Sequence, residues 1–584
     1  MEWLAGCVEP FPAASRGLPG ELKPFPGVQL VPCRAMSLVR VIPLGGVGEI
    51  GKNCTLVEQG DDIVVIDCGL SFPTEEMLGI DIVIPDFSYL IENKHRVKGI
   101  FITHAHEDHV GGLPYLLPHL DCPLYVTEFT HALLKSKLDE KIPATKVNYK
   151  IFKPGDIIEA GALSVEPVRI THSIPETCAM AVRTPHGIVF FTADFKFDFT
   201  PVDSKLTNIA RIGELGREGV LLLLSDSTNV ERPGWGPSER SVTDGLRNVF
   251  MNAKGRVLLT TFASNIHRMQ QVYEIAAEMG RKVAVVGRRM EQNMDICERM
   301  GYVKIPKGTR IALSDMKMFP DEQVAILTTG SQGEPMSALV QMSKGSYGRL
   351  QIKQGDTLIY SARPIPGNEG AIWRTINRLF RQGCNVIYDS KTPIHVSGHA
   401  YQEELKMMIN LTRPYYVAPV HGEPRHQHLY NQIAVEMGYP EHRVFTLSDG
   451  DALCMDDTAA HIESDAVPYG RVLVDNTGTP GVTDDILRDR FNVANDGIVV
   501  VTIALDVEKG EIVADPVIQS KGFHGPSGSM DTAFDHLCDA LQSLSREELK
   551  DVARVKSDAA DVVKRALQKK AQRRPMVLPV VIEV

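Results

Sequence analysis

The sequence contains no apolar run near the roughly 20 residues that a membrane-spanning helix needs, so we expect no membrane segment. Its ten cysteines include no C-x-x-C pair, which argues against a zinc knuckle or a disulfide framework and favours reduced thiols in a cytoplasmic protein. Excess positive charge is missing as well, because the formal net charge is -11. The chain therefore does not grip nucleic acid through its total charge, although a local basic groove remains open.

What is present is the composition of an ordinary globular protein, with 43% hydrophobic residues, 23% charged residues and a mean hydropathy of -0.08. A chain of 584 residues is too long for one core, so two to four domains are expected. The first 36 residues are rich in proline and glycine and lack a charged segment followed by an apolar one. We expect a flexible extension there rather than a secretory signal, with Met36 as an alternative start.

Short β-rich runs bounded by turn residues follow, up to about residue 230. Many of them end in Asp, His or Thr, which places reactive groups on loops at one rim of a sheet. The runs comprise residues 39–42, 63–67, 99–103, 124–127, 188–192 and 220–225.

The pattern changes between residues 231 and 390 to apolar strands separated by helical patterns such as residues 266–279 and 370–382. This alternation is typical of a parallel sheet with helices on its faces. Residue types that bind metals reappear after it, so we interpret the segment as an inserted domain. The last region combines a strand at residues 497–505, a basic helix-like stretch and an apolar tail at residues 580–584.

The segment His104-Ala-His106-Glu-Asp108-His109 directly follows the strand-like run at residues 99–103. Imidazoles on a loop can face one point, and they suit Zn²⁺ or Mn²⁺, while the carboxylate can serve a second ion. The alternative is a solvated histidine-rich loop. Isolated residues of the same types at other strand ends argue against it, namely His172, Asp194 and His421. We assign no ligand role to Glu107.

H-x-H-x-D-H followed by single His, Asp and His residues resembles the metallo-β-lactamase superfamily, whose fold is an αββα sandwich. The resemblance implies that Asp194 bridges two divalent ions. It assigns His104, His106 and His172 to one ion and Asp108, His109 and His421 to the other. Such a pair of ions suits hydrolysis of phosphodiesters. Zinc is our first expectation for the metal and manganese the alternative, because this ligand set accepts both.

Two further segments, Ser225-Asp-Ser-Thr-Asn229 and His395-Val-Ser-Gly-His399, together with His421, resemble the nucleic-acid-processing branch called β-CASP. The resemblance implies that Asp226 orients a histidine and that His399 protonates the leaving oxygen, a role worth roughly 10²–10⁴-fold in rate. Asp226, His399 and Asp108 are the predicted catalytic residues. The alternatives are a turn-forming aspartate for Asp226 and a core histidine for His395.

Two loops are expected to hold the nucleotide beside the cut, because a strand end that opens a helix offers N–H groups to an anion. The predicted substrate-binding residues are Ser264, Asn265, Ile266, His395, Val396, Ser397, Gly398 and His399. Arg268 and Arg363 are candidate phosphate contacts, with a structural salt bridge as the equal alternative.

The glycine-rich run at residues 43–53, the wording around residues 104–112 and the tail after residue 471 are similar to the bacterial ribonuclease J family. We interpret the glycine-rich run as a strand-to-strand turn rather than a dinucleotide-binding loop, because no acidic ribose partner is evident. The resemblance implies an α/β protein: a metallo-β-lactamase αββα sandwich with an inserted α/β β-CASP domain and a small C-terminal α/β domain. The expected division is a flexible extension at 1–36, the sandwich at 37–230 and 391–465, the insertion at 231–390 and the C-terminal domain at 466–584.

The same resemblance implies a ribonuclease that degrades single-stranded RNA from a 5′ monophosphate and also cuts internally, in messenger RNA decay and ribosomal RNA maturation. It implies a homodimer or homotetramer, with RNA-decay or ribosome-associated proteins as possible partners. A β-lactamase or thioester hydrolase is the rival enzyme, and an RNA-binding scaffold without activity is the rival of another class. DNA stays open as a substrate, because recognition of the 2′-OH depends on geometry.

Overall fold

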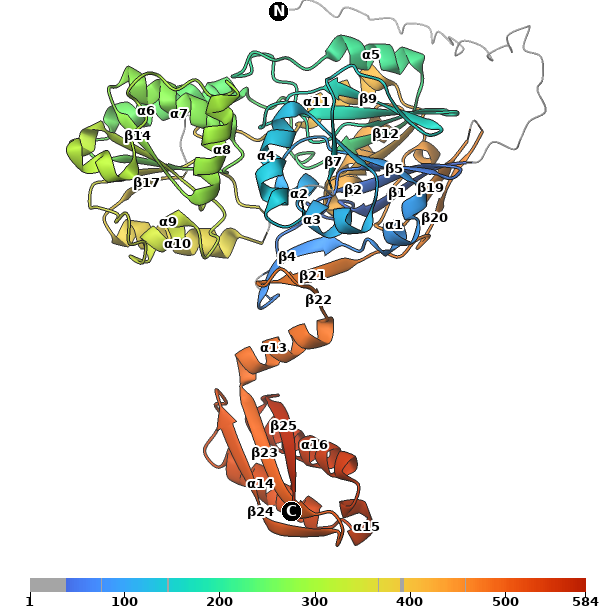
Figure 1. The fold of residues 1–584 in the computed structure, drawn as a ribbon, viewed down its shortest axis with the longest axis vertical. Helices are drawn as coiled ribbons and strands as arrows, with labels where there is room; N and C mark the ends of the chain where they lie inside the picture. Colours follow the sequence, from blue (N-terminus) through green and yellow to red (C-terminus); the bar gives the residue numbers. More distant parts are fainter. Residues whose placement is uncertain (1–37, 75, 144–146, 366, 389–392, 457) are drawn as a thin grey trace, which may run out of the picture. The chain divides into compact units, whose positions relative to one another are not determined.

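The structure is a computed structural model that describes residues 38–584 apart from 75, 144–146, 366, 389–392 and 457 (Figure 1). The extension expected at residues 1–36, with the alternative start at Met36, lies outside the described residues. None of the helices in the described part has the length and apolar character needed to cross a bilayer.

The first large sheet has eight strands in the order β20-β19-β1-β2-β3-β5-β6-β7. Its strands are β1 (Val39–Gly45), β2 (Cys54–Gln59), β3 (Asp62–Ile66), β5 (Val97–Phe101), β6 (Pro123–Val126), β7 (Asn148–Ile151), β19 (Ala452–Met455) and β20 (Ala460–Glu463). Successive side chains of a strand point to opposite faces. In β3, Val64 and Ile66 therefore enter one hydrophobic cluster and Ile63 and Val65 another, so both faces of this sheet are covered.

The second large sheet has six strands in the order β18-β12-β11-β10-β9-β8. Its strands are β8 (Ile158–Ala160), β9 (Leu163–Arg169), β10 (Cys178–Thr184), β11 (Gly187–Phe191), β12 (Val220–Asp226) and β18 (Tyr416–Val420). β18 pairs in parallel with β12 although some 190 residues separate them, with Asp226 opposite Val420. The segments that follow both strands therefore leave the sheet at the same edge.

Helices cover the outer faces of the two sheets and complete an αββα sandwich (Figure 1). On the side of the first sheet these are α1 (Ser88–Glu92), α2 (Glu107–Val110), α3 (Leu113–Leu116) and α4 (Glu128–Asp139), and on the other side α5 (Ile209–Glu218), α11 (Gln402–Thr412) and α12 (Pro424–Glu436). The glycine-rich run connects β1 to β2. Gly46, Gly48 and Gly51 have the G-x-G-x-x-G spacing and positive φ values, but no helix follows them, so the interpretation as a turn is confirmed.

The insertion contains a five-stranded, wholly parallel sheet in the order β14-β15-β13-β16-β17. Its strands are β13 (Val257–Thr260), β14 (Lys282–Val286), β15 (Val324–Thr328), β16 (Thr357–Tyr360) and β17 (Asn385–Ile387). Its helices are α6 (Val242–Asn252), α7 (Ile266–Glu278), α8 (Arg288–Arg299), α9 (Ala338–Ser343) and α10 (Glu369–Arg381). Val257 and Leu259 pack into one cluster and Leu258 into another, so this sheet too is buried on both faces, as expected for parallel strands.

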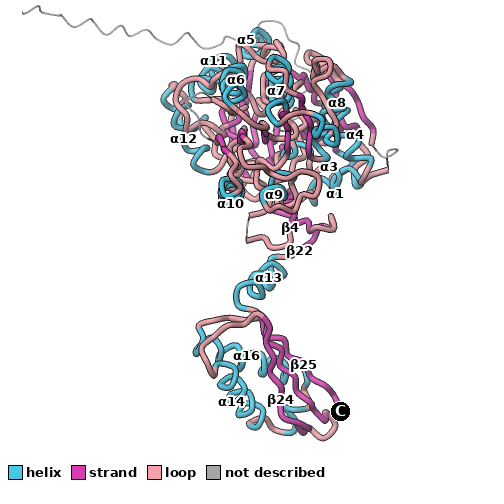
Figure 2. Tube along the Cα trace, turned by 90° about the vertical axis from the view of Figure 1, so that its left-hand side faces the viewer, coloured by secondary structure: helices cyan, strands magenta, loops and turns pink. Residues whose placement is uncertain are grey.

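The C-terminal region begins with a small antiparallel sheet that joins β21 (Arg471–Asp475) and β22 (Pro480–Val482) to β4 (Ile80–Pro85). After α13 (Asp484–Asp496), a three-stranded sheet follows in the order β24-β23-β25. It comprises β23 (Ile498–Asp506), β24 (Glu511–Lys521) and β25 (Met576–Glu583), and its helices are α14 (Ser529–Gln542), α15 (Arg546–Leu549) and α16 (Val552–Ala571). α14 and α16 lie against one face of the sheet (Figure 2).

Candidate metal centre

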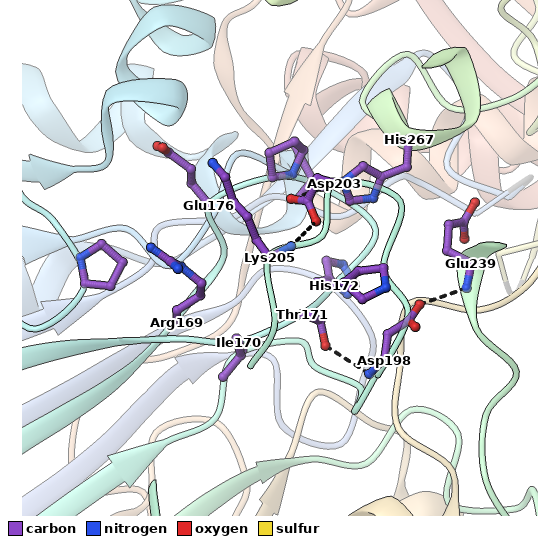
Figure 3. Close-up of a pocket in the computed structure, with 14 residues that line it drawn as sticks. Arg169, Ile170, Thr171, His172, Glu176, Asp198, Asp203, Lys205, Glu239 and His267 are labelled. Atoms are coloured by element: carbon purple, nitrogen blue, oxygen red, sulfur yellow. Dashed lines mark hydrogen bonds and ion pairs between the residues drawn. The ribbon is translucent and has the colours of Figure 1, made fainter. Parts of the chain in front are cut away.

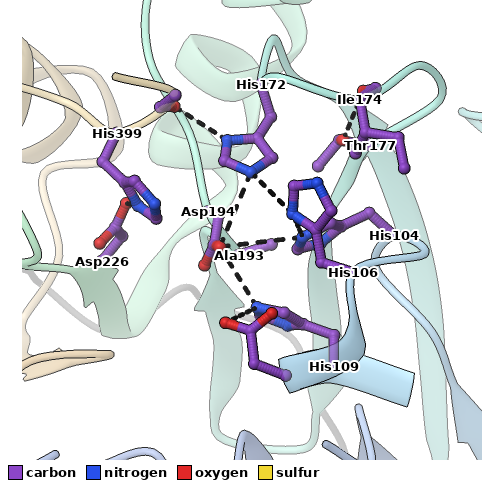
Figure 4. A network of polar contacts seen from close by, with 12 residues as sticks. His104, His106, His109, His172, Ile174, Thr177, Ala193, Asp194, Asp226 and His399 are labelled. Carbon is purple, nitrogen blue, oxygen red and sulfur yellow. Dashed lines mark hydrogen bonds and ion pairs between the residues drawn. The ribbon is translucent and has the colours of Figure 1, made fainter. Parts of the chain in front are cut away.

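The side chains predicted to bind metal come from loops that directly follow strands of the two facing sheets (Figure 4). The loop after β5 carries His104 and His106, and the short helix α2 carries Asp108 and His109. α2 begins at Glu107 with His106 as its N-cap residue. Glu107 instead pairs with Lys137, at the surface.

The structure brings all seven predicted ligands together in two groups of donor atoms that share Asp194. Within each group the donor atoms lie within 4.8 Å of one another. His104, His106 and His172 form the first group, in which Nδ1 of His106 is 3.0 Å from Nε2 of His104 and 3.2 Å from Nε2 of His172. Asp108, His109 and His421 form the second.

The chemistry of the first group fits a divalent cation. Burial lowers the pKa of His104 and His172 well below the usual value and that of His106 to about 4, so the imidazoles are neutral and keep a lone pair for a metal. Oδ1 of Asp194 is buried without a hydrogen-bond partner among the described residues, and Nδ1 of His421 lies 3.5 Å from it. A buried carboxylate oxygen of this kind is costly unless a cation or a donor satisfies it.

The second group is held in the opposite charge state. Burial opposes a charge on His421, yet Asp194 and the other nearby carboxylates raise its pKa to about 10. The pKa of His109 is raised in the same way, and the two imidazolium groups hold the pKa of Asp194 below its usual range against the effect of burial. His109 and His421 must therefore lose protons to act as ligands, so metal binding here releases protons.

Further residues orient these ligands, and two of them, Asp67 and Thr228, had no predicted role. Oδ2 of Asp67 is 2.7 Å from Nδ1 of His109, and Oγ1 of Thr228 is 2.8 Å from Nδ1 of His421. Nδ1 of His172 meets the carbonyl oxygen of Gly398 at 2.9 Å, and a Cβ on Gly398 would lie 2.6 Å from the His172 ring. The sequence signal that could have identified Asp67 is its position at the end of a strand, which it shares with the ligands.

His399 and Asp226 form a pair beside the ligands, with Nδ1 of His399 2.8 Å from Oδ2 of Asp226. Oδ1 of Asp226 accepts hydrogen bonds from N and Oγ1 of Thr228, which fixes the carboxylate. Burial opposes a charge on His399, but Asp226 and Asp194 raise its pKa above the usual value. A protonated imidazole held by a buried carboxylate can deliver a proton to a leaving oxygen.

The predicted substrate-binding residues divide into exposed and buried side chains. Ile266 and Val396 pack into the core, so they can offer only backbone groups to a ligand. Asn265 caps α7, its side chain accepting from the N–H of Arg268. Oγ of Ser397 accepts from Nδ2 of Asn229 at 2.7 Å.

Two other predicted substrate-binding residues, Ser264 and His395, are not fully buried. Ser264 is partly exposed, and His395 is half-buried with an Nδ1 that has no hydrogen-bond partner. Arg268 has the structural role: it is fully buried, pairs with Glu239 and donates to the carbonyl oxygen of Ile394.

A pocket lies next to the metal-ligand cluster and adjoins the first turn of α7 (Figure 3). His172 and His267 both line it, together with Asp203 and Lys205. Nε2 of His267 is buried without a hydrogen-bond partner and lies 3.7 Å from Oδ2 of Asp203. The pocket thus adjoins both the candidate metal centre and the loop predicted to bind substrate.

Comparisons with known families match most of the chain. Residues 47–221 match the metallo-β-lactamase superfamily and residues 254–379 match the β-CASP domain of ribonuclease J. Residues 388–446 match the RNA specificity domain of Zn-dependent metallo-hydrolases, and residues 485–584 match the C-terminal domain of ribonuclease J. The predicted fold class is confirmed, whereas the exact domain boundaries stay a prediction.

Individual relatives are similar over nearly their whole length. Ribonuclease J2 of Bacillus subtilis is 40% identical over 94% of this chain and 99% of its own, and ribonuclease J of Thermus thermophilus is 42% identical over 93% and 95%. A crystal structure of an Enterococcus faecalis protein of unknown function, 17% identical, superposes with a TM-score of 0.52 over 72% of this chain and 100% of its own. That likeness shows the fold alone. The sequence relatives and the family matches show that the chain belongs to the ribonuclease J family of the metallo-β-lactamase superfamily.

Proposed function

We propose that this metal-dependent ribonuclease hydrolyses single-stranded RNA from a 5′ monophosphate and also cuts internally. The observation that carries the proposal is the convergence of seven metal-ligand side chains beside the His399–Asp226 pair. The names of its relatives support RNA as the substrate. By the same reasoning we propose roles in messenger RNA decay and ribosomal RNA maturation.

The seven donors would hold two divalent cations, with zinc proposed first and manganese as the alternative. When bound, such ions supply a nucleophilic water and neutralise charge on the phosphate. The chain's own residues supply orientation and the proton. Asp67, Thr228 and Gly398 fix the ring orientations of His109, His421 and His172.

In this proposal His399 protonates the leaving oxygen as the phosphodiester bond breaks. Asp226 keeps His399 protonated and correctly oriented, and Thr228 prevents the carboxylate from rotating. The segment 395–399 places this acid next to the ligand His172, because Gly398 contacts that ring directly. Substitution at Gly398 would push the acid and the ligand apart.

We also propose that the protein forms a homodimer or homotetramer through its C-terminal sheet. One face of β25 leaves Leu578, Val580 and Ile582 exposed, opposite Val500, Thr502 and Ala504 of β23. Contiguous exposed apolar surface of this kind is typical of an interface.

The first test is to incubate the purified protein and Mn²⁺ or Zn²⁺ with matched single-stranded RNA and DNA that carry a 5′ monophosphate or a 5′ triphosphate. We expect mononucleotides from the monophosphorylated RNA and slower attack on the triphosphorylated strand. Cutting of DNA alone, or of neither polymer, would keep the fold and refute the function. Hydrolysis of a β-lactam or a thioester without RNA cleavage would support the rival enzyme class.

A further inference from the structure

Arg232 and Arg363 come from different parts of the chain and converge on Tyr401, two residues beyond His399. Arg232 follows β12 in the sandwich, and Arg363 follows β16 in the insertion. The guanidinium carbon of Arg232 lies 5.6 Å from the centre of the Tyr401 ring, and its Nη1 is 3.5 Å from the Tyr401 hydroxyl. Burial lowers the pKa of Arg363, the charge of Arg232 lowers it further, and Tyr401 offsets part of this effect.

Neither guanidinium forms an ion pair with a carboxylate of the described residues. Nη1 of Arg363 is buried and has no hydrogen-bond partner within the described part of the chain. Among the buried arginines of the insertion, Arg256 and Arg268 pair with Asp356 and Glu239, whereas Arg281 donates to backbone carbonyl oxygens. Arg232 and Arg363 thus place two like charges close together without a carboxylate partner, which is unfavourable unless an anion joins them.

Tyr401, at which the arginines meet, closely follows the loop that carries the proton donor. Asn229, three residues before Arg232, donates to Oγ of Ser397 and to the carbonyl oxygen of His399. On the other side, burial lowers the pKa of His395, and the charges of Arg268, Arg363 and Lys196 lower it further. His395, at the start of this segment, thus lies in a positive field to which Arg363 contributes.

We propose that Arg232 and Arg363 form a clamp for a phosphate group of the RNA, with one arginine from the segment after β12 and the other from the loop after β16. The proposal deepens the proposed function and rests on it. A guanidinium binds phosphate oxygens through paired N–H donors and remains charged throughout the physiological pH range. The phosphate is either the 5′-terminal monophosphate or an internal phosphodiester, which share this chemistry. The Tyr401 ring gives the Arg232 guanidinium a flat surface to lie against.

The test measures binding of the full-length protein to fluorescent single-stranded RNA in the presence of a chelator, so that no cleavage occurs. RNAs with a 5′ monophosphate and with a 5′ hydroxyl are compared at several salt concentrations. For Arg232→Gln and Arg363→Gln we expect affinity to fall about 10-fold each at low salt, because a charge-assisted hydrogen bond is lost. The slope of log K against log salt should become shallower by about 0.7 for each phosphate contact that is lost from a single strand.

The two RNAs separate the sources of the phosphate. A loss seen only with the 5′-monophosphate RNA identifies the terminal phosphate, and an equal loss with both RNAs identifies an internal one. The variants Arg232→Lys and Arg363→Lys keep the charge and should retain the salt slope with a smaller loss of affinity. They also keep the test valid if the glutamine variants unfold.

Arg299→Gln is the matched control. Arg299 is exposed on α8, and its replacement by Gln removes one positive charge, as in the two test variants. Affinity and slope equal to those of this control in both glutamine variants would overturn the clamp while leaving the ribonuclease proposal intact. If the unchanged protein binds neither RNA, the proposed function fails together with the clamp, and the two failures are thereby distinguished.

Discussion

Polar side chains are buried at the rim of the αββα sandwich, whereas apolar side chains are exposed on the uncovered face of the C-terminal sheet. At the rim, His104 is 0% exposed and Asp194 is 2% exposed, although both are polar. On the C-terminal sheet, Leu578 is 45% exposed and Ile582 is 50% exposed, although both are apolar. Buried polar groups are costly unless they are satisfied, and exposed apolar patches are costly unless they are covered. The first region therefore indicates chemistry and the second indicates association.

The backbone makes the same distinction. Asp67, Ala193 and His421 adopt positive φ values of 62°, 52° and 51° around the metal-ligand cluster. Conformations of this kind cost non-glycine residues roughly 1–3 kcal/mol each and persist only where the surroundings enforce them. The strands of the C-terminal sheet contain no such residue among those described. The rim is strained to position side chains, whereas the sheet is regular and presents a surface.

Replacing Asp194 with Ala should produce the largest effect of the substitutions considered. Both groups of ligands lose their shared carboxylate, so we expect hydrolysis of RNA to fall by roughly 10³-fold or more and bound metal to decrease. Product analysis and elemental analysis of the purified variant measure the two quantities. Self-association should be unchanged, because the C-terminal sheet is untouched.

Asp485→Ala is the control, since Asp485 is exposed on α13 and its loss also removes one carboxylate. It should leave both metal content and rate at the level of the unchanged protein. An unaltered rate in the Asp194 variant would refute the assignment of the metal centre. A variant that lost activity and self-association together would show that rim and sheet are not independent.

The metal loop was predictable from sequence because its residues are close together in the chain, whereas its supports were not. Three histidines and an aspartate within residues 104–109 indicate a metal at once. Thr228 and His421 are separated by 193 residues, and only the parallel pairing of β12 with β18 brings them together. Composition around Thr228 carries no sign of that contact.

Burial also limited the prediction of the substrate loops. Ile266 and Val396 lie within segments that were predicted to bind substrate, yet their side chains belong to the core. Arg268 shows the same limit, since sequence left a phosphate contact and a salt bridge equally open and Glu239 decides for the latter. For the apolar tail, the sequence left open whether it packs within its domain or between subunits, because β25 is almost continuously apolar and its sequence does not reveal which face is covered.

Replacing His399 with Ala should slow hydrolysis by roughly 10²–10⁴-fold and leave RNA affinity close to that of the unchanged protein. The raised pKa of His399 means that the proton donor is present below that pKa and is lost as the pH rises through it. The rate of the unchanged protein should therefore decline on the alkaline side, and this decline should be absent in the variant. Single-turnover rates across pH, with separate binding measurements, test this.

Asp226→Asn sharpens the same prediction. Without the carboxylate, the pKa of His399 should fall, so the alkaline decline should move to lower pH while the imidazole remains in place. A purely structural role for Asp226 would lower the rate equally at every pH. A loss of RNA binding without any change in the chemical step would mean that His399 is not the proton donor.

Replacing Ile582 with Asp should have the smallest effect on catalysis and the clearest effect on assembly. A carboxylate on the apolar face of β25 resists burial against another subunit, so light scattering should show a shift toward the monomer. The site is remote in sequence from the metal ligands, and we expect the rate per chain to change only several-fold. Because Ile582 is exposed, the free energy of unfolding of the monomer should change by no more than about 0.5 kcal/mol.

Val577→Asp is the contrast, since Val577 is buried on the other face of the same strand and the change should destabilise the domain itself. An unaltered oligomer in the Ile582 variant would show that the exposed apolar face serves something other than self-association. The C-terminal sheet would then no longer contrast with the rim as a surface for association.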